Sequence, residues 1–131
     1  MVESKKKQFE YQKKIALVVG ISDYDNLKEI KDEEEKKKYE NYGNLPPTEE
    51  DMVVVRAGLL RLGFKDEEII PLQGPTNREF LNKCIEIRNM VDTNFANEPN
   101  KNTLVFIYYA GHGVSDNYTF AILNEANPGK Q

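Results

Sequence analysis

The chain has one histidine, one cysteine and no hydrophobic run long enough to cross a membrane. A single cysteine excludes an internal disulfide and is typical of proteins from a reducing compartment, so we expect a cytoplasmic location. The lysine-rich start has no apolar stretch, so we do not expect it to act as a secretory signal. A net charge of −4 gives no reason to expect nucleic acid as a partner, and nothing points to a membrane partner.

Other absences exclude two further kinds of site. The segment after the apolar run Ile15–Ile21 lacks the spaced glycines of a nucleotide-binding loop. One histidine without a neighbouring ligand cluster gives poor support for a metal site. Residues 22–44 are acidic but lack the alternating ligands of a dedicated calcium loop. The residues themselves therefore predict no cofactor and no metal.

The length of 131 residues fits one small domain, and 39% hydrophobic with 31% charged residues indicates a globular protein with much of its charge in exposed loops. We expect a basic N-terminal arm over residues 1–14 and a single domain over residues 15–131.

Three apolar runs predict strands. Ile15–Ile21 and Leu104–Ala110 are continuous and rich in β-branched and aromatic residues, which is typical of strands buried on both faces of a parallel sheet. Ile69–Leu72 is shorter, and Pro71 confines it to an edge or a strand end. We therefore expect the strand order 2-1-3, with the first strand in the middle.

Two helices are predicted between these strands. The first has Thr48 as its cap and Asp51 three residues later, and it ends at Gly63. The second begins at Thr76, with Glu79 completing a capping box, and runs to about Val91. The alternation of strand and helix predicts an α/β fold with right-handed crossovers. The apolar stripe of the first helix consists of Met52, Val55, Leu59 and Leu62.

The most polar part of the chain is Ser22–Asn44. Its run Asp32–Lys38 places opposite charges at i,i+4 spacing, which indicates a solvated excursion with a short helix. Two interpretations stay open: an exposed insertion without a role, or a lid or rim over a cleft.

His112 follows the Leu104–Ala110 strand, where functional groups of open α/β sheets gather. Gly111 and Gly113 permit unusual backbone angles and close approach of another segment. A base next to a bare Gly113 amide suits acyl-transfer chemistry, while the alternative is a tight turn with a surface histidine. Cys84 shares a helix face with Phe80, Ile87 and Val91, which favours a core residue over a nucleophile.

Several segments together resemble the caspase-like cysteine peptidases, and metacaspases and paracaspases more than animal caspases. The resemblance extends from Ile15 to Leu123 and implies a three-layer fold with a mainly parallel sheet flanked by helices. The matching segments are Ala16–Tyr24, the helix entry from Leu45-Pro46 to Asp51-Met52, Leu62-Gly63-Phe64 and, most specifically, Tyr108-Tyr109-Ala110-Gly111-His112-Gly113.

The resemblance implies roles for four residues. His112 would be the catalytic base and acid, and the Gly113 amide would help to form the oxyanion hole. Asp51, with Glu50 assisting, would line a pocket for Lys or Arg before the cut in a protein or peptide substrate. The alternative is that these carboxylates only favour the helix N-terminus. Calcium dependence is possible by family resemblance alone.

In the caspase-like family the nucleophilic cysteine lies on the next core strand after the histidine. The sequence ends at Gln131 before such a strand, so we expect the domain to be truncated before the nucleophile strand and inactive alone. We also expect a partner chain or a missing C-terminal half to cover the open edge of Leu104–Ala110. Two functions follow: the His-bearing part of a cysteine endopeptidase, or a catalytically inactive caspase-like module that acts as a scaffold or regulatory subunit.

Overall fold

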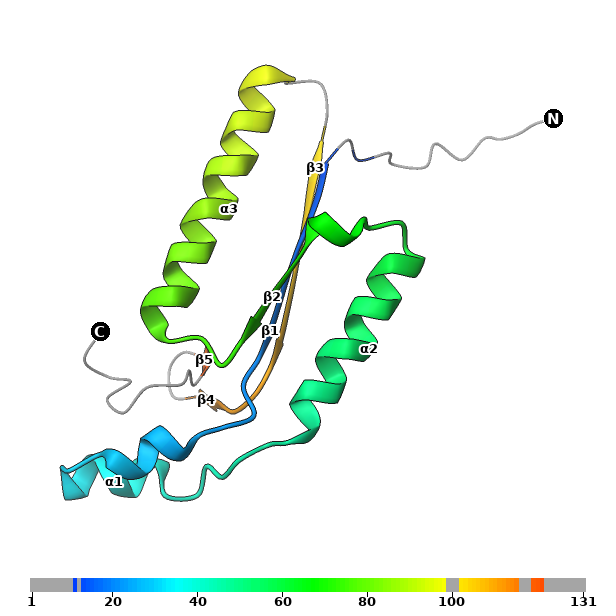
Figure 1. Ribbon diagram of the computed structural model, residues 1–131. Helices are drawn as coiled ribbons and strands as arrows, with labels where there is room; N and C mark the ends of the chain where they lie inside the picture. Colours follow the sequence, from blue (N-terminus) through cyan, green and yellow to red (C-terminus); the bar gives the residue numbers. More distant parts are fainter. Residues whose placement is uncertain (1–10, 12, 99–101, 116–118, 122–131) are drawn as a thin grey trace.

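The computed structural model describes residues 11, 13–98, 102–115 and 119–121 (Figure 1). Three strands form a parallel sheet, and two short strands form an antiparallel pair after it. The elements are, in chain order, β1 (Lys13–Gly20), the 3₁₀ helix η1 (Asp25–Glu29), α1 (Glu33–Tyr39), α2 (Pro47–Arg61), the 3₁₀ helix η2 (Asp66–Glu68), β2 (Ile69–Gln73), α3 (Asn77–Asn97), β3 (Thr103–Ala110), β4 (Gly113–Ser115) and β5 (Thr119–Ala121).

The sheet has the order β2-β1-β3, which confirms the predicted α/β fold and strand order. The helices α2 and α3 lie on opposite sides of the sheet, so the domain has three layers (Figure 1). Of the predicted N-terminal arm, residues 1–10 and 12 lie outside the described residues, and Lys13 and Lys14 begin β1. No helix in the described part of the chain is both long and apolar enough to cross a bilayer.

The core is built around β1, whose side chains alternate between the two faces of the sheet. Ala16 and Val18 pack against Leu59 of α2, and Leu17 and Val19 pack with Ile87 of α3. Full burial of one such aliphatic side chain contributes about 1.5–3 kcal/mol. This central strand, paired on both sides and covered on both faces, corresponds to the buried strand that the sequence predicts.

The expectation that Leu104–Ala110 is buried on both faces is wrong. Val105 and Phe106 are each 36% exposed and Ile107 is 58% exposed. The reason is that β3 lies at a sheet edge, with β1 as its neighbour on one side only within the described part of the chain. An apolar run therefore predicted the strand correctly but not the extent of its burial.

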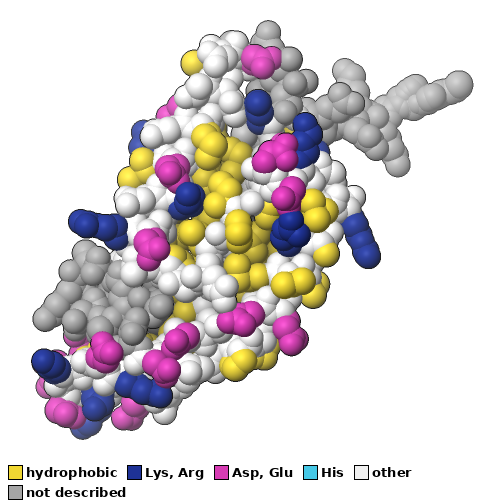
Figure 2. Space-filling view, in the orientation of Figure 1, with side chains coloured by type: hydrophobic (Ala, Val, Ile, Leu, Met, Phe, Trp, Pro, Cys, Tyr) yellow, Lys and Arg dark blue, Asp and Glu magenta, His cyan; other side chains and the backbone are white. Residues whose placement is uncertain are grey.

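The other edge of the sheet is β2, where the prediction for Pro71 is confirmed. Pro71 pairs with Val18 in register, and its nitrogen carries no hydrogen for a further ladder. Figure 2 shows apolar side chains between the two helices on the side of the molecule that carries this strand. The proline makes β2 a poor template for another strand.

The predicted capping box at the start of α3 is confirmed. The Glu79 amide donates to Oγ1 of Thr76 at 3.2 Å, and the Thr76 amide donates to the Glu79 carboxylate at 3.1 Å. The helix continues past Val91 to Asn97, because no glycine or proline interrupts residues 92–97.

The predicted cap of α2 is wrong. The helix begins at Pro47, so Thr48 lies inside its first turn, where it is 6% exposed and its Oγ1 has no hydrogen-bond partner among the described residues. Leu62 is 74% exposed and does not belong to the apolar stripe. Gly63 ends the helix as expected, with φ of +96°.

The segment 22–44 is more than a solvated insertion. Its helix α1 is exposed, as predicted, but Tyr24, Leu27 and Ile30 are buried and form a small core with Ile21. This core fixes the segment against the carboxyl edge of the sheet, which is where His112 lies.

Thr48 and Thr76 offer a matched pair of substitutions. Thr48→Val removes a buried hydroxyl that has no hydrogen-bond partner in the described part of the chain, and it should raise the free energy of unfolding by about 1 kcal/mol. Thr76→Val removes a cap and should lower it by about 1 kcal/mol. Urea unfolding of both variants measures the two effects, and a loss of stability in Thr48→Val would contradict the helix start described here.

Candidate active site

The carboxyl ends of β1 and β3 meet where the Gly20–Ala110 pair closes their ladder. The Ile21 amide then donates to the Ala110 carbonyl at 2.9 Å, so the two segments that follow leave the sheet side by side. One of them is Gly111–His112, and the other begins the segment 22–44. The register of the sheet therefore places the sole histidine next to the most polar part of the chain.

Two tyrosines hold the backbone of His112. Its amide donates to the hydroxyl of Tyr24 at 2.7 Å, and its carbonyl accepts from the hydroxyl of Tyr109 at 2.6 Å. The Tyr24 ring is 1% exposed, and a hydroxyl at that depth is stable only when it is hydrogen-bonded. The main chain at His112 is thus fixed on both of its polar groups.

Gly111 is required by space. A Cβ atom at this position would lie 2.5 Å from the hydroxyl oxygens of both Tyr24 and Tyr109. The expected close approach of another segment is confirmed. The expected unusual backbone angle is not, because the glycines with positive φ in the described part of the chain are Gly63 and Gly74.

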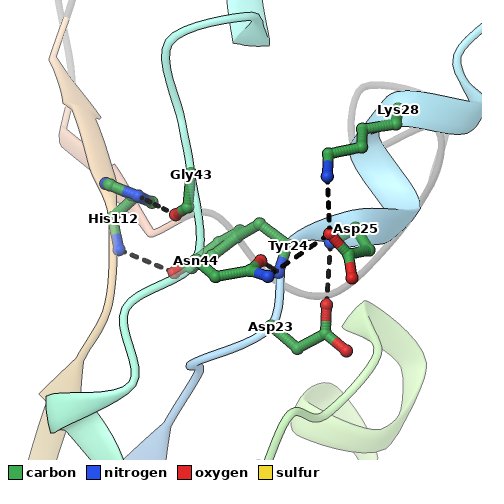
Figure 3. Close-up of polar contacts among 7 residues, drawn as sticks. All are labelled: Asp23, Tyr24, Asp25, Lys28, Gly43, Asn44 and His112. Atoms are coloured by element: carbon green, nitrogen blue, oxygen red, sulfur yellow. Dashed lines mark hydrogen bonds and ion pairs between the residues drawn. The ribbon is translucent and has the colours of Figure 1, made fainter.

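The His112 ring is oriented by the segment 22–44 (Figure 3). Its Nε2 lies 2.8 Å from the carbonyl oxygen of Gly43. A carbonyl only accepts, so Nε2 carries the hydrogen and the neutral ring has its unprotonated nitrogen at Nδ1. The rings of Tyr24 and Tyr42 lie 4.6 and 5.0 Å from the imidazole, centroid to centroid. The geometry leaves Nδ1 as the nitrogen that can take up a proton.

Sequence reasoning missed the contacts that Tyr24, Tyr42 and Gly43 make with His112. The signal available was the apolar spacing Ile21, Tyr24, Leu27 and Ile30 in an otherwise charged segment, which marks an inward face. Of the two interpretations left open for Ser22–Asn44, the contacts agree with the one that makes it part of a site rim.

Glu50 and Asp51 are exposed near the start of α2, and neither makes a hydrogen bond or ion pair with His112. The carboxylate that the structure ties to the carboxyl edge of the sheet is Glu49. Its Oε1 accepts from Oγ of Ser22 at 3.2 Å and from Nε2 of Gln73 at 2.8 Å. The assignment of Asp51 and Glu50 to a substrate pocket stays a prediction.

Gly113 begins β4, where it pairs with Ala121 of β5. It is exposed and directly follows the fixed main chain of His112. Its role as an oxyanion donor stays a prediction.

Cys84 lies on α3 in the apolar cluster that contains Leu17, Val19 and Ile87. Burial in this cluster raises the pKa of its thiol. A raised pKa leaves less thiolate at neutral pH, which is the opposite of what a nucleophile requires. The expected structural role of Cys84 agrees with this environment.

Two observations bear on other kinds of site. Within the described ranges, no group of three or more His, Cys, Asp and Glu side chains is arranged to hold a metal ion. A cavity of about 480 Å³ lies at the amino end of β1, lined in part by Lys13, Ile15, Lys65 and Met90. It is at the other end of the sheet from His112 and does not belong to this site.

Comparison with known proteins agrees with this architecture. A family model of the caspase domain matches residues 13–126, which is nearly the whole chain. The chain therefore belongs to the caspase-domain family. No curated protein and no solved structure gives a significant match. The closer likeness to metacaspases and paracaspases stays a prediction.

Gly111→Ala and Gly43→Ala add the same methyl group at two glycines near His112, and they should differ in their effect on stability. Gly111→Ala should lower the free energy of unfolding by about 1–3 kcal/mol, because the new methyl group must displace two fixed hydroxyls. Gly43→Ala should be neutral, because a Cβ there would meet no heavy atom of the described residues within 4 Å apart from its own chain neighbours. Equal stabilities of the two variants in urea would contradict the packing around Gly111.

Alkylation of Cys84 tests whether His112 activates its thiol. Cys84 in the folded chain should react with iodoacetamide at least about tenfold more slowly than in the urea-unfolded chain, because burial raises its pKa. His112→Ala should leave the folded rate unchanged. A slower reaction in that variant would show that His112 activates Cys84 and would overturn the structural role of the cysteine.

Proposed function

We propose that this caspase domain is the His-bearing part of a cysteine endopeptidase, with His112 as general base and acid. The observation that carries the proposal is the Nε2 hydrogen bond to Gly43, which supports Nδ1 as the basic nitrogen. The fixed backbone of His112 supports it further, since a catalytic base must be held within hydrogen-bond reach of the proton that it moves.

The proposed reaction follows thiol acyl transfer. Nδ1 of His112 takes the proton of a cysteine thiol, and the thiolate attacks the scissile carbonyl carbon. The Gly113 amide donates to the resulting oxyanion. The imidazolium then gives its proton to the leaving amine, and water, deprotonated by the same imidazole, hydrolyses the thioester and restores the thiol.

The cysteine in this proposal comes from a strand that pairs with the side of β3 that no strand of the described residues occupies. The eight residues Thr103–Ala110 contain no proline, whereas β2 has Pro71 near its middle. Val105, Phe106 and Ile107 are also exposed on this strand, which favours a covered edge in the working protein. Either a partner chain or a continuation of this chain could supply that strand.

Glu50 and Asp51 support a preference for Lys or Arg before the cut. Together with Glu49 they make the start of α2 strongly acidic. The proposal assigns Asp51 the main contact and Glu50 an assisting one. It includes no cofactor, and calcium dependence is tested by adding a chelator to the assay described next.

The assay uses the protein as isolated from its natural source, with any chain that co-purifies, and fluorogenic peptides that end in Lys, Arg or a neutral residue. We expect cleavage that thiol alkylation stops and that His112→Ala lowers by about 10²–10⁴-fold in the recombinant assembly. Unchanged cleavage in His112→Ala would overturn the proposal. No cleavage with partner binding intact in both forms would instead support the inactive scaffold or regulatory module.

A charge-matched pair tests the pocket. Asp51→Asn should reduce the preference for Lys or Arg over a neutral residue by about fivefold, which is the size of one partly exposed ion pair. Asp92→Asn makes the same charge change on α3 and should leave the preference unchanged. Equal effects of the two variants would remove Asp51 from the pocket.

A further inference from the structure

Two parts of the segment 22–44 contact His112, and they lie far apart in the sequence. The Tyr24 hydroxyl accepts from the His112 amide, and the Gly43 carbonyl accepts from Nε2 of the ring. The first contact fixes the main chain and the second fixes the ring. The imidazole keeps one orientation only if these two parts are held in a constant relation to each other.

The side chain of Asn44 joins the two parts (Figure 3). Its Oδ1 accepts from the Tyr24 amide at 2.7 Å, and its Nδ2 donates to Oδ1 of Asp25 at 3.3 Å. Asn44 directly follows Gly43 in the chain. The side chain that binds the Tyr24 amide is therefore attached to the residue next to the one whose carbonyl binds the ring.

Asp25 is itself held in place. Nζ of Lys28 donates to its Oδ1 at 2.9 Å, and its amide donates to Oδ1 of Asp23 at 2.8 Å. The hydrogen bond from Lys28 and then that from Asn44 hold the pKa of the Asp25 carboxyl below its usual value. This exposed group is therefore charged at neutral pH and remains an acceptor for Asn44.

We propose that Asn44 is a positioning residue for His112, which sets the orientation of the imidazole by tying the main chain of Tyr24 to that of Gly43. It touches neither substrate nor the reacting atoms, and it acts through Gly43 and Tyr24. Its value for catalysis rests on the proposed function, but its effect on the ring does not.

If Asn44 served only to stabilise the fold, its variants would lose stability. Asn44 is exposed and contributes no apolar surface to the core. Its removal should leave the buried cluster of Ile21, Leu27 and Ile30 in place. We therefore expect variants at this position to stay folded while the ring loses its fixed partner.

The single histidine allows a direct test by nuclear magnetic resonance, because all imidazole signals come from His112. The parent chain should show an Nε2 proton protected from exchange with water.

Asn44→Ala should raise the exchange rate of this Nε2 proton by about tenfold or more, since the Gly43 carbonyl is no longer held. Asn44→Asp combined with Asp25→Asn keeps the acceptor for the Tyr24 amide without placing two carboxylates together, and it should retain most of the protection. Asn41→Ala, an exposed asparagine of the same segment, is the control and should change nothing.

Protection that is unchanged in Asn44→Ala would overturn the proposal, as would an equal loss in Asn41→Ala. If Asn44→Ala does not fold, the double variant Asn44→Asp/Asp25→Asn decides: a protected proton supports the role of the acceptor, and its loss in a folded chain contradicts it. The peptidase assay separates this result from the proposed function. Loss of protection in Asn44→Ala together with no thiol-dependent cleavage by the parent assembly would keep the positioning role and reject the peptidase.

Discussion

The parallel ladder between β1 and β3 ends with Gly20 opposite Ala110, and the surroundings of His112 depend on this register. A shift by one residue would turn every side chain of β3 to the other face of the sheet. Tyr109 would then leave the face on which its hydroxyl meets the His112 carbonyl. The same register brings the start of the segment 22–44 beside Gly111, so that the Tyr24 hydroxyl meets the His112 amide. The position of the histidine is thus a consequence of strand pairing.

The segment 22–44 has an exposed charged part and a buried apolar part, and its overall composition does not show which residues belong to each. Its outer helix α1 is charged and exposed, while Tyr24, Leu27 and Ile30 are buried beneath it. The buried side chains stabilise the segment against the sheet edge through the hydrophobic effect. The polar groups at its two ends can therefore hold the imidazole by its main chain and by Nε2.

The sequence predicted the fold well, because its signals are local. Continuous apolar runs specified the strands, Pro71 specified an edge, and the pair Thr76–Glu79 specified a helix start. It failed where the outcome depends on distant contacts: the exposure of Val105–Ile107 follows from which neighbours β3 has, and the burial of Thr48 follows from where α2 meets the sheet.

The candidate site was predicted only in part for the same reason. The position of His112 after a core strand is visible in the sequence, and so is a family resemblance. The carbonyl of Gly43 is not visible, because any residue has a carbonyl and only the fold brings this one to Nε2. The bridge through Asn44 is equally hidden, since it joins segments about twenty residues apart. The pocket role predicted for Asp51 concerns contacts with a substrate, which the sequence does not contain.

The most direct test of the account is the tautomer of His112, read from the ¹⁵N chemical shifts of its ring in the neutral form and from coupling across the hydrogen bond to the Gly43 carbonyl carbon. We predict a proton on Nε2, coupling to Gly43, and an unprotonated Nδ1 available as base. A proton on Nδ1, with no coupling to Gly43, would contradict it and would leave the histidine without the orientation that the proposed chemistry requires.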